Sequence, residues 1–216
     1  MLPIGDDNSQ RRLVPVVTWL LVIANVLVFF LETTGGEAFI QRWSFIPARF
    51  SQDPAGNFIT ILTSMFMHAG WPHLGGNMLY LIIFGDNVED RFGHLKFLIF
   101  YVLCGIIAMS AQYIVAPMVN VINLGASGAI AGILGAYLLL YPRRRVRVLL
   151  GIWIVHLPAL LVIGGWILLQ LLSGLGSVST ANGGVAYMAH IGGFFGGLVF
   201  SYFFRKRIRA LPPSYN

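Results

Sequence analysis

Long apolar runs, each about the length of a membrane-spanning helix, dominate this chain of 216 residues. Hydrophobic residues make up 57% of the sequence and charged residues only 10%, whereas soluble domains average about 25% charged residues. This composition excludes a soluble globular domain, and the high hydrophobicity excludes a disordered chain. The apolar runs are continuous rather than alternating, which argues against a β-barrel. The sequence therefore predicts an all-α polytopic membrane protein.

Six of these runs are candidate membrane spans, because a helix needs about 20 mostly apolar residues to cross a bilayer. From the N-terminus they are Val14–Leu31, His73–Val88, Leu95–Ala116, Ala126–Tyr141, Val148–Leu172 and Val185–Phe204. We expect residues 13–204 to form one six-helix membrane domain, between a short N-terminal tail (1–12) and a basic C-terminal tail (205–216). The mixed segment Glu32–Asn57 contains Trp and Phe residues, which suit a helix-and-loop element at the membrane interface.

The positive charges predict the orientation of these spans. If the chain starts in the cytoplasm, twelve of its 14 Lys and Arg residues lie on the cytoplasmic side, and only Arg42 and Arg49 do not. This bias predicts that both termini are cytoplasmic. The basic segment Arg205–Arg209 is explained by its role in setting the membrane orientation and by contact with anionic lipid headgroups. We therefore expect a lipid bilayer, and no nucleic acid, as partner. With no transit-like leader, the chain suits a prokaryotic inner membrane.

Several kinds of membrane chemistry lack the residues that they need. All eight acidic residues lie in predicted loops or at the ends of predicted spans. An aspartyl intramembrane protease and a carboxylate-based proton transporter both need acidic groups at mid-membrane depth. The chain has no His-Glu-x-x-His motif, and its single cysteine, Cys104, can form neither an intrachain disulfide nor a cysteine metal cluster. We therefore expect no metal and no cofactor.

A small polar set remains at similar predicted depth near the outer ends of spans two, four and six: His68, His73, Asn77, Ser127 and His190. A serine hydroxyl needs a positioned base, and His190 is a candidate for that base. His73 and Asn77 share a helix face and carry N–H donors for an oxyanion, as does the backbone of Ser127. No acidic residue can orient His190, so the expected arrangement is a dyad. We expect His68, nearer the interface, to be structural or solvent-facing.

Each of these residues has a structural explanation when it is taken alone. Ser127 lies in the small-residue run Gly125–Gly128, and His190 precedes Gly192-Gly193 and Gly196-Gly197. Small residues let membrane helices pack closely, and polar side chains hydrogen-bond between helices. Packing is the simpler explanation of Ser127 alone, and an interhelical hydrogen bond that of His190 alone. It is the convergence of three segments that favours an enzyme.

In combination, these motifs resemble the rhomboid family of intramembrane serine proteases. The resemblance covers about Val14 to Phe204, and the motifs follow in order: His73-x-x-x-Asn77, Glu89-x-Arg91, Gly125-x-Ser127-Gly128 and Ala189-His190-x-x-Gly193-x-x-x-Gly197. The resemblance implies a six-helix bundle with a short fourth span raised in its middle. It also implies a water-filled cavity that opens to the outer face.

The resemblance further implies a role for each matching residue. Ser127 matches the nucleophile and His190 matches the general base. The side chains of His73 and Asn77, with the backbone N–H of Ser127, match the oxyanion hole. The substrates implied are single-span membrane proteins, cut in or near the span.

Glycines beside these residues are expected to allow close packing near the site. They are Gly125 and Gly128, together with Gly193 and Gly197, which match family glycines that bring the sixth span close to the fourth. The segment Ser173–Gly184 matches a loop that caps the cavity, and its Gly and Ser content suits a mobile lid.

Two positions differ from the family pattern. Ile59-Thr60 stands where many members carry a Trp-Arg pair, and Ala131 stands where many carry an aromatic residue that packs on the base.

Two other functions stay open. One is a rhomboid-like protein that holds membrane helices without cutting them, and the other is a small transporter or channel. The presence of both Ser127 and His190 argues against the first. The lack of inverted repeats and of charges within the spans argues against the second.

Overall fold

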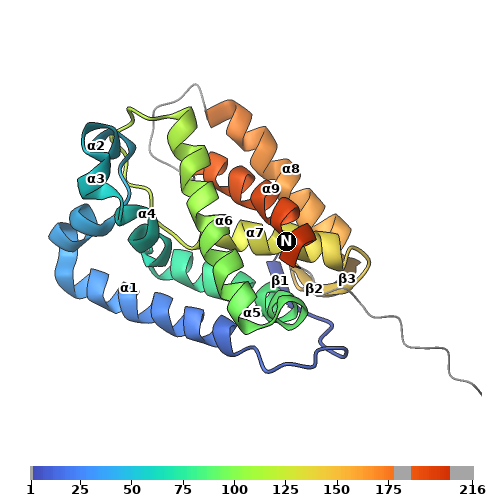
Figure 1. Ribbon diagram of the computed structural model, residues 1–216. Helices are drawn as coiled ribbons and strands as arrows, with labels where there is room; N and C mark the ends of the chain where they lie inside the picture. The colour runs from blue at the N-terminus through green and yellow to red at the C-terminus, as the bar shows by residue number, and fades with distance from the viewer. Residues whose placement is uncertain (1, 178–185, 205–216) are drawn as a thin grey trace, which may run out of the picture.

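The computed structural model describes residues 2–177 and 186–204, which form a helical bundle with a small sheet at one end (Figure 1). The long helices are α1 (Val16–Trp43), α5 (Trp71–Phe92), α6 (His94–Val115), α7 (Ser127–Leu140), α8 (Ala159–Ser177) and α9 (Tyr187–Phe204). Between α1 and α5 lie the short elements α2 (Pro47–Gln52), α3 (Pro54–Asn57), α4 (Thr60–Thr63) and the 3₁₀ helix η1 (Ser64–Phe66). The strands are β1 (Leu2–Asp6), β2 (Arg145–Leu150) and β3 (Trp153–Pro158).

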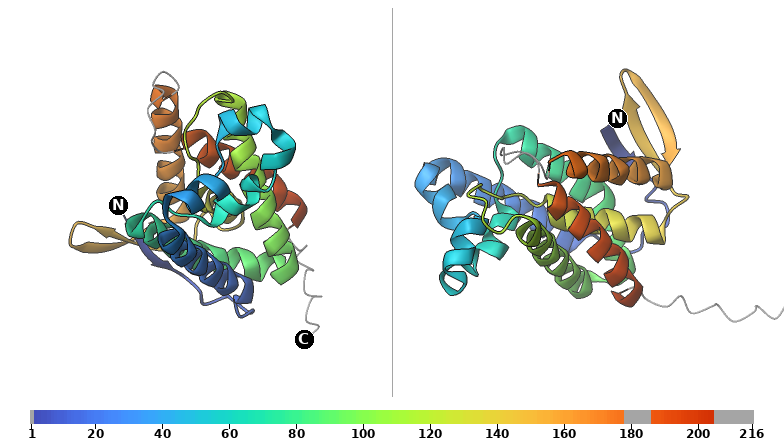
Figure 2. Two further views of the ribbon diagram at one scale, coloured as in Figure 1. Left: turned by 90° about the vertical axis from the view of Figure 1, so that its left-hand side faces the viewer. Right: turned by 90° about the horizontal axis from the view of Figure 1, so that it is seen from above.

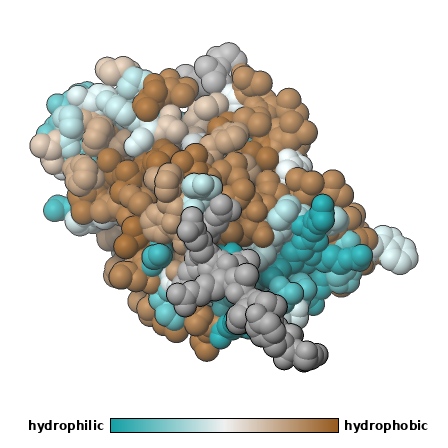
Figure 3. All heavy atoms as spheres, turned by 45° about the vertical axis from the view of Figure 1, so that its right-hand side comes forward, coloured by the Kyte–Doolittle hydropathy of each residue, from teal (hydrophilic) through white to brown (hydrophobic). Residues whose placement is uncertain are grey.

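Among the described residues, three helices are long and apolar enough to cross a membrane by length and composition, namely α1, α6 and α9. The apolar parts of α7 and α8 are shorter. Hydrophobic side chains cover the middle of the face drawn in Figure 3, and hydrophilic side chains gather at two opposite ends. Many large apolar side chains are exposed, among them Leu20 on α1 and Leu169 on α8. Such a band is the surface that a bilayer would cover.

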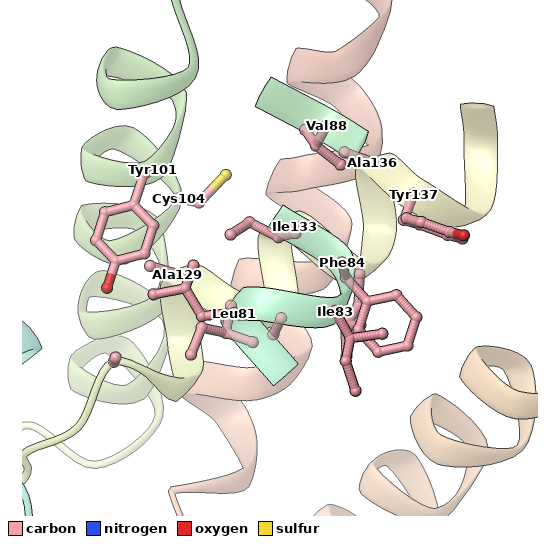
Figure 4. Packing of buried hydrophobic residues seen from close by; sticks show 14 of the residues in the cluster. Leu81, Ile83, Phe84, Val88, Tyr101, Cys104, Ala129, Ile133, Ala136 and Tyr137 are labelled. Carbon is pink, nitrogen blue, oxygen red and sulfur yellow. The ribbon is translucent and has the colours of Figure 1, made fainter. Parts of the chain in front are cut away.

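Helix α7 lies inside the bundle, and this is why its sequence is apolar on every side. Every residue from Gly128 to Tyr137 is buried. Figure 4 shows α7 side chains among those of its neighbours α5 and α6; the labelled residues are Leu81, Ile83, Phe84, Val88, Tyr101, Cys104, Ala129, Ile133, Ala136 and Tyr137. A helix buried in this way offers a rigid base for groups at its first turn.

The close approach of α7 and α9 depends on glycine. A Cβ atom at Gly193 would collide with the carbonyl oxygen of Gly128, and one at Gly197 would collide with that of Gly132. On another side of α7, a Cβ at Gly128 would meet the Cβ of Ala108, on α6. The backbones of α7 and α9 therefore touch directly, as small residues allow in membrane bundles.

The first predicted span is longer than expected. We predicted that it ends at Leu31, but α1 continues to Trp43 and is interrupted at Gly36, whose φ of 61° and ψ of −154° are not helical. Only glycine adopts such a backbone conformation readily. The expected mixed segment Glu32–Asn57 is therefore largely helical, with short helices that lie at the far end of the bundle from the sheet (Figure 2).

The prediction of an all-α fold is wrong at the other end. There β1, β2 and β3 form an antiparallel sheet in that order, with Leu2 paired to Leu149 and Arg145 paired to Pro158. The predicted fifth span, Val148–Leu172, is wrong in its first part, because this part forms most of the β2–β3 hairpin. The helix begins only at Ala159, after Pro158.

The N-terminal residues, expected as a tail, contain β1, which a partly buried polar network fastens to the bundle. Asp6 accepts hydrogen bonds from the hydroxyl of Tyr137 at 2.6 Å and from the amide of Asn87 at 2.9 Å. Arg11 forms an ion pair with Asp86 at 2.6 Å. The sheet is thereby held against α5 and α7.

Candidate active site

A cavity of about 1160 Å³ lies between α1, α5 and the first turns of α7 and α9. Its lining includes four of the predicted site residues: His73, Asn77, Ser127 and His190. The structure thus brings together side chains that lie more than 100 residues apart in the sequence. A concave site with a few converging polar groups is the usual form of a small binding or catalytic centre.

Ser127 and His190 face each other across the contact between α7 and α9. Ser127 is the first residue of α7, and His190 lies in the first turn of α9. The Oγ atom of Ser127 lies 2.8 Å from Nε2 of His190, which suits a hydrogen bond from the hydroxyl to a neutral imidazole. The glycines that let α7 and α9 touch therefore also bring this pair together.

The other nitrogen of His190 contacts a residue that the sequence analysis missed. Nδ1 of His190 lies 2.8 Å from Oε1 of Gln170, on α8. The indole of Trp166, also on α8, lies against the imidazole with ring centroids 5.8 Å apart and ring planes at 38°. A signal was available, because Gln170 is the single polar side chain in the apolar run from Ala159 to Leu172, and polar residues within spans are costly.

His73, on the first turn of α5, presents a donor to the same region. The backbone N–H of Ala69 donates to Nδ1 of His73 at 3.3 Å, so the neutral ring carries its proton on Nε2. A Cβ built on Gly125 would lie 3.0 Å from that Nε2 and 3.6 Å from Oγ of Ser127. Gly125 itself has φ of 130°, so both its backbone conformation and the nearby His73 ring favour glycine.

Asn77 lies one turn further along α5 and is buried. Its Nδ2 atom has no hydrogen-bond partner among the described residues, and its side chain lines the cavity. Buried amides are nearly always paired. Asn77 therefore lines the cavity with a buried donor that no described residue uses.

His68 is buried rather than solvent-facing, with only 1% of its surface exposed. Its backbone N–H donates to the carboxylate of Glu32 at 2.9 Å, and its ring lies edge-on to that of His73. Neither ring nitrogen has a hydrogen-bond partner within the described part of the chain. His68 also lines the cavity.

The predicted lid, Ser173–Gly184, falls mostly outside the described residues. Its first part continues α8 as far as Ser177, and residues 178–185 are not described. Within residues 2–177 and 186–204, no group of three or more His, Cys, Asp or Glu side chains could hold a metal ion.

Comparison with known proteins matches the Rhomboid domain model to residues 55–207. The Bacillus subtilis (strain 168) protein "Putative rhomboid protease YdcA" is 29% identical over 204 residues, covering 92% of this chain and 94% of that protein. "Rhomboid protease GluP" of the same organism is 35% identical over 126 residues, covering 57% and 24%. "Rhomboid protein 1, mitochondrial" of Saccharomyces cerevisiae (strain ATCC 204508 / S288c) is 27% identical over 209 residues, covering 89% and 54%. Because the domain model matches well over half of its length, this chain belongs to the rhomboid family.

Proposed function

We propose that this protein is an intramembrane serine endopeptidase that cuts peptide bonds in or near the transmembrane segments of single-span membrane proteins. The observation that carries the proposal is the 2.8 Å separation of Ser127 Oγ from His190 Nε2 on the wall of a large cavity. The names of the relatives YdcA and GluP, which include the words rhomboid protease, agree with it.

The first step is attack by the serine hydroxyl. Oγ of Ser127 forms a bond to the carbonyl carbon of the scissile peptide while its proton passes to Nε2 of His190. The carbonyl π electrons move to the oxygen, which becomes an oxyanion. His190 becomes an imidazolium, so the site holds one new positive and one new negative charge.

Three donors are available to stabilise the oxyanion. They are Nε2–H of His73, Nδ2–H of Asn77 and the backbone N–H of Ser127. The N–H of Ser127 has no carbonyl one turn earlier in its helix, since Ser127 begins α7. Each donor is held by a helix rather than by a flexible loop. Preorganised donors of this kind lower the barrier because they need no rearrangement as charge develops.

The second half of the reaction returns the proton. Nε2–H of His190 gives its proton to the leaving amine as the C–N bond breaks, which leaves an ester between Ser127 and the new carboxyl end. A water molecule then attacks the ester, His190 takes the proton from that water and passes it to Oγ of Ser127, and the acid is released. The sequence of steps needs no metal and no cofactor.

The membrane arrangement belongs to the same proposal. Helices α1 and α5–α9 are the six spans of a membrane domain covering residues 13–204. The basic hairpin β2–β3 and both termini lie in the cytoplasm, and the active site opens to the outer face of a prokaryotic inner membrane. A substrate helix must unwind there before its carbonyl carbon can be attacked, because a helix keeps its carbonyls in its own hydrogen bonds.

The proposal is tested by fluorophosphonate labelling of the purified full chain in detergent, beside Ser127→Ala and His190→Ala. We expect labelling of the wild type and none of either variant, with all three proteins equally folded by thermal unfolding. The same proteins are then tested on a single-span substrate in liposomes. Folded wild-type protein that is neither labelled nor able to cut would overturn the proposal and favour a protein that only binds helices.

A further inference from the structure

We propose that Gln170 is a positioning residue that holds the His190 ring in the tautomer required for catalysis. The inference rests on the proposed function, since it assigns a task toward the same general base. Gln170 comes from α8, which carries none of the residues predicted for the site from the sequence. The pair Ser127–His190 is thereby extended by a neutral third member.

The hydrogen-bond geometry fits this task. Oε1 of Gln170 lies 2.8 Å from Nδ1 of His190, and Nε2 of the same ring lies 2.8 Å from Oγ of Ser127. A neutral imidazole has one N–H group and one bare nitrogen. A carboxamide oxygen only accepts, so it selects the tautomer with the proton on Nδ1. Nε2 is then bare and can accept the Ser127 proton.

The face of the ring is held by the same helix. Trp166 precedes Gln170 by four residues, so both side chains project from one face of α8. The Trp166 indole lies against the imidazole, with centroids 5.8 Å apart, and also lies near Phe194 at 6.4 Å. Ala131, where an aromatic support was expected from the family pattern, is fully buried and offers no ring. Trp166 supplies that support from α8.

The choice of an amide has a physical reason. Gln170 stands in an apolar stretch with no cation nearby in the sequence, and an ionised carboxylate there would lack a partner. A neutral acceptor can orient His190 without that cost. Once His190 is protonated, the Gln170 carbonyl dipole and the Trp166 π face both favour the positive ring.

The test compares Gln170→Leu and Gln170→Glu with wild type in the full chain. Leu168→Ala, at an exposed position of α8, controls for changes in the helix itself. We expect Gln170→Leu to lower kcat and the rate of fluorophosphonate labelling by about 10- to 100-fold, the range found when a metal-bound histidine loses the partner that orients it. KM should stay nearly constant. Leu168→Ala should stay within twofold of wild type.

Gln170→Glu separates positioning from packing. Its carboxylate still accepts from Nδ1, so it should restore most of the rate and move the acidic limb of the pH–rate profile to higher pH, because a neighbouring negative charge favours the imidazolium. A Gln170→Leu protein that is labelled within twofold of the wild-type rate would overturn the inference. So would a Gln170→Glu protein that is as slow as Gln170→Leu.

Two further measurements keep the outcome decisive. If Gln170→Leu does not fold, Gln170→Met, which is unbranched and has no carbonyl, takes its place. Nitrogen NMR of histidine-labelled protein should report the Nδ1–H tautomer of His190 in wild type and a tautomer mixture in the apolar variant; the same tautomer in both would overturn the inference. Ser127→Ala and His190→Ala are included throughout. If either of these two variants is labelled, the proposed function fails. If neither is labelled but Gln170→Leu is labelled normally, only the positioning role of Gln170 is refuted and the proposed function stands.

Discussion

The carboxylate of Glu89, on α5, accepts two hydrogen bonds from Thr18, one from its backbone N–H and one from its hydroxyl, both at 2.7 Å. It also accepts from the backbone N–H of Val17 at 2.9 Å. The first N–H groups of a helix have no partners within that helix, and Pro15, before α1, provides no side-chain cap. Glu89 therefore caps α1 from another helix and places negative charge at its positive end.

Replacing Glu89 should destabilise the protein strongly. Glu89→Ala leaves three buried donors unpaired, and we expect a loss of about 3 kcal/mol or more in the free energy of unfolding. Glu89→Gln keeps a carbonyl acceptor and should lose less. Denaturant unfolding in detergent measures both changes. An alanine variant as stable as wild type would show that water replaces the carboxylate at this helix end.

The contact between α7 and α9 should not tolerate a methyl group. Gly193→Ala would push its Cβ into the Gly128 carbonyl, and such overpacking costs about 1–3 kcal/mol. The shift should also separate Ser127 from His190 and reduce labelling. Gly164→Ala is the matched control, since a Cβ there meets nothing within 4 Å. Equal stability and labelling of the two variants would contradict the role of this glycine.

Asn77→Ala should lower the rate without harming the fold. Its Nδ2 has no partner among the described residues, so its removal breaks no side-chain hydrogen bond of that donor. Loss of one oxyanion donor usually costs about 10²–10³-fold in kcat. Steady-state cleavage of a liposomal substrate, with a thermal unfolding scan of the same sample, checks this. A variant that is folded but completely inactive would point to a larger role for Asn77.

Asp6 should make the attachment of β1 depend on pH. Burial, the largest cause, raises the pKa of Asp6 to about 6 from 3.8, and the nearby Asp86 adds to this, while Tyr137 and Arg144 oppose it. Because the folded-state pKa is the higher one, the folded state binds the proton more tightly. The contribution of Asp6 to stability is therefore complete below about pH 4 and lost as the pH rises through 6.

Unfolding measured from pH 4 to 7 tests this dependence. Asp6→Asn is neutral at every pH, so it should remove the part of the slope that arises from Asp6. The remaining titrating groups are the same in both proteins, which makes the comparison direct. Identical slopes for wild type and variant would mean that Asp6 titrates alike in the folded and unfolded chains.

A metal chelator should leave cleavage unchanged. The proposed steps use side chains and backbone of this chain together with one water molecule, and no metal-ligating cluster occurs among the described residues. Incubation with a strong chelator before the liposome assay is the measurement. Inhibition that added zinc reverses would require a metal in the mechanism.

The positions of the helices could largely be predicted, because a long apolar run has few alternatives in a membrane chain. The hairpin could not, since the alternation of Arg145, Val146, Arg147 and Val148 merges with the apolar run that follows it. A short alternation of polar and apolar residues is a weak signal for a strand when it adjoins an apolar run of more than 20 residues, which is a strong signal for a helix. In the folded protein β2 pairs with β1, which lies more than 130 residues away in the chain, and no local pattern in the sequence could predict that pairing.

The sequence by itself determined the membrane class and the family, and it predicted four residues that line one cavity, His73, Asn77, Ser127 and His190. It could do so because polar side chains in apolar spans are costly and therefore few. Only the tertiary structure decided which of them meet and what else joins them. Gln170 and Trp166 reach His190 because of the rotation and tilt at which α8 packs on α9. Those angles arise from side-chain packing between separate helices. They cannot be predicted from the sequence of α8 alone.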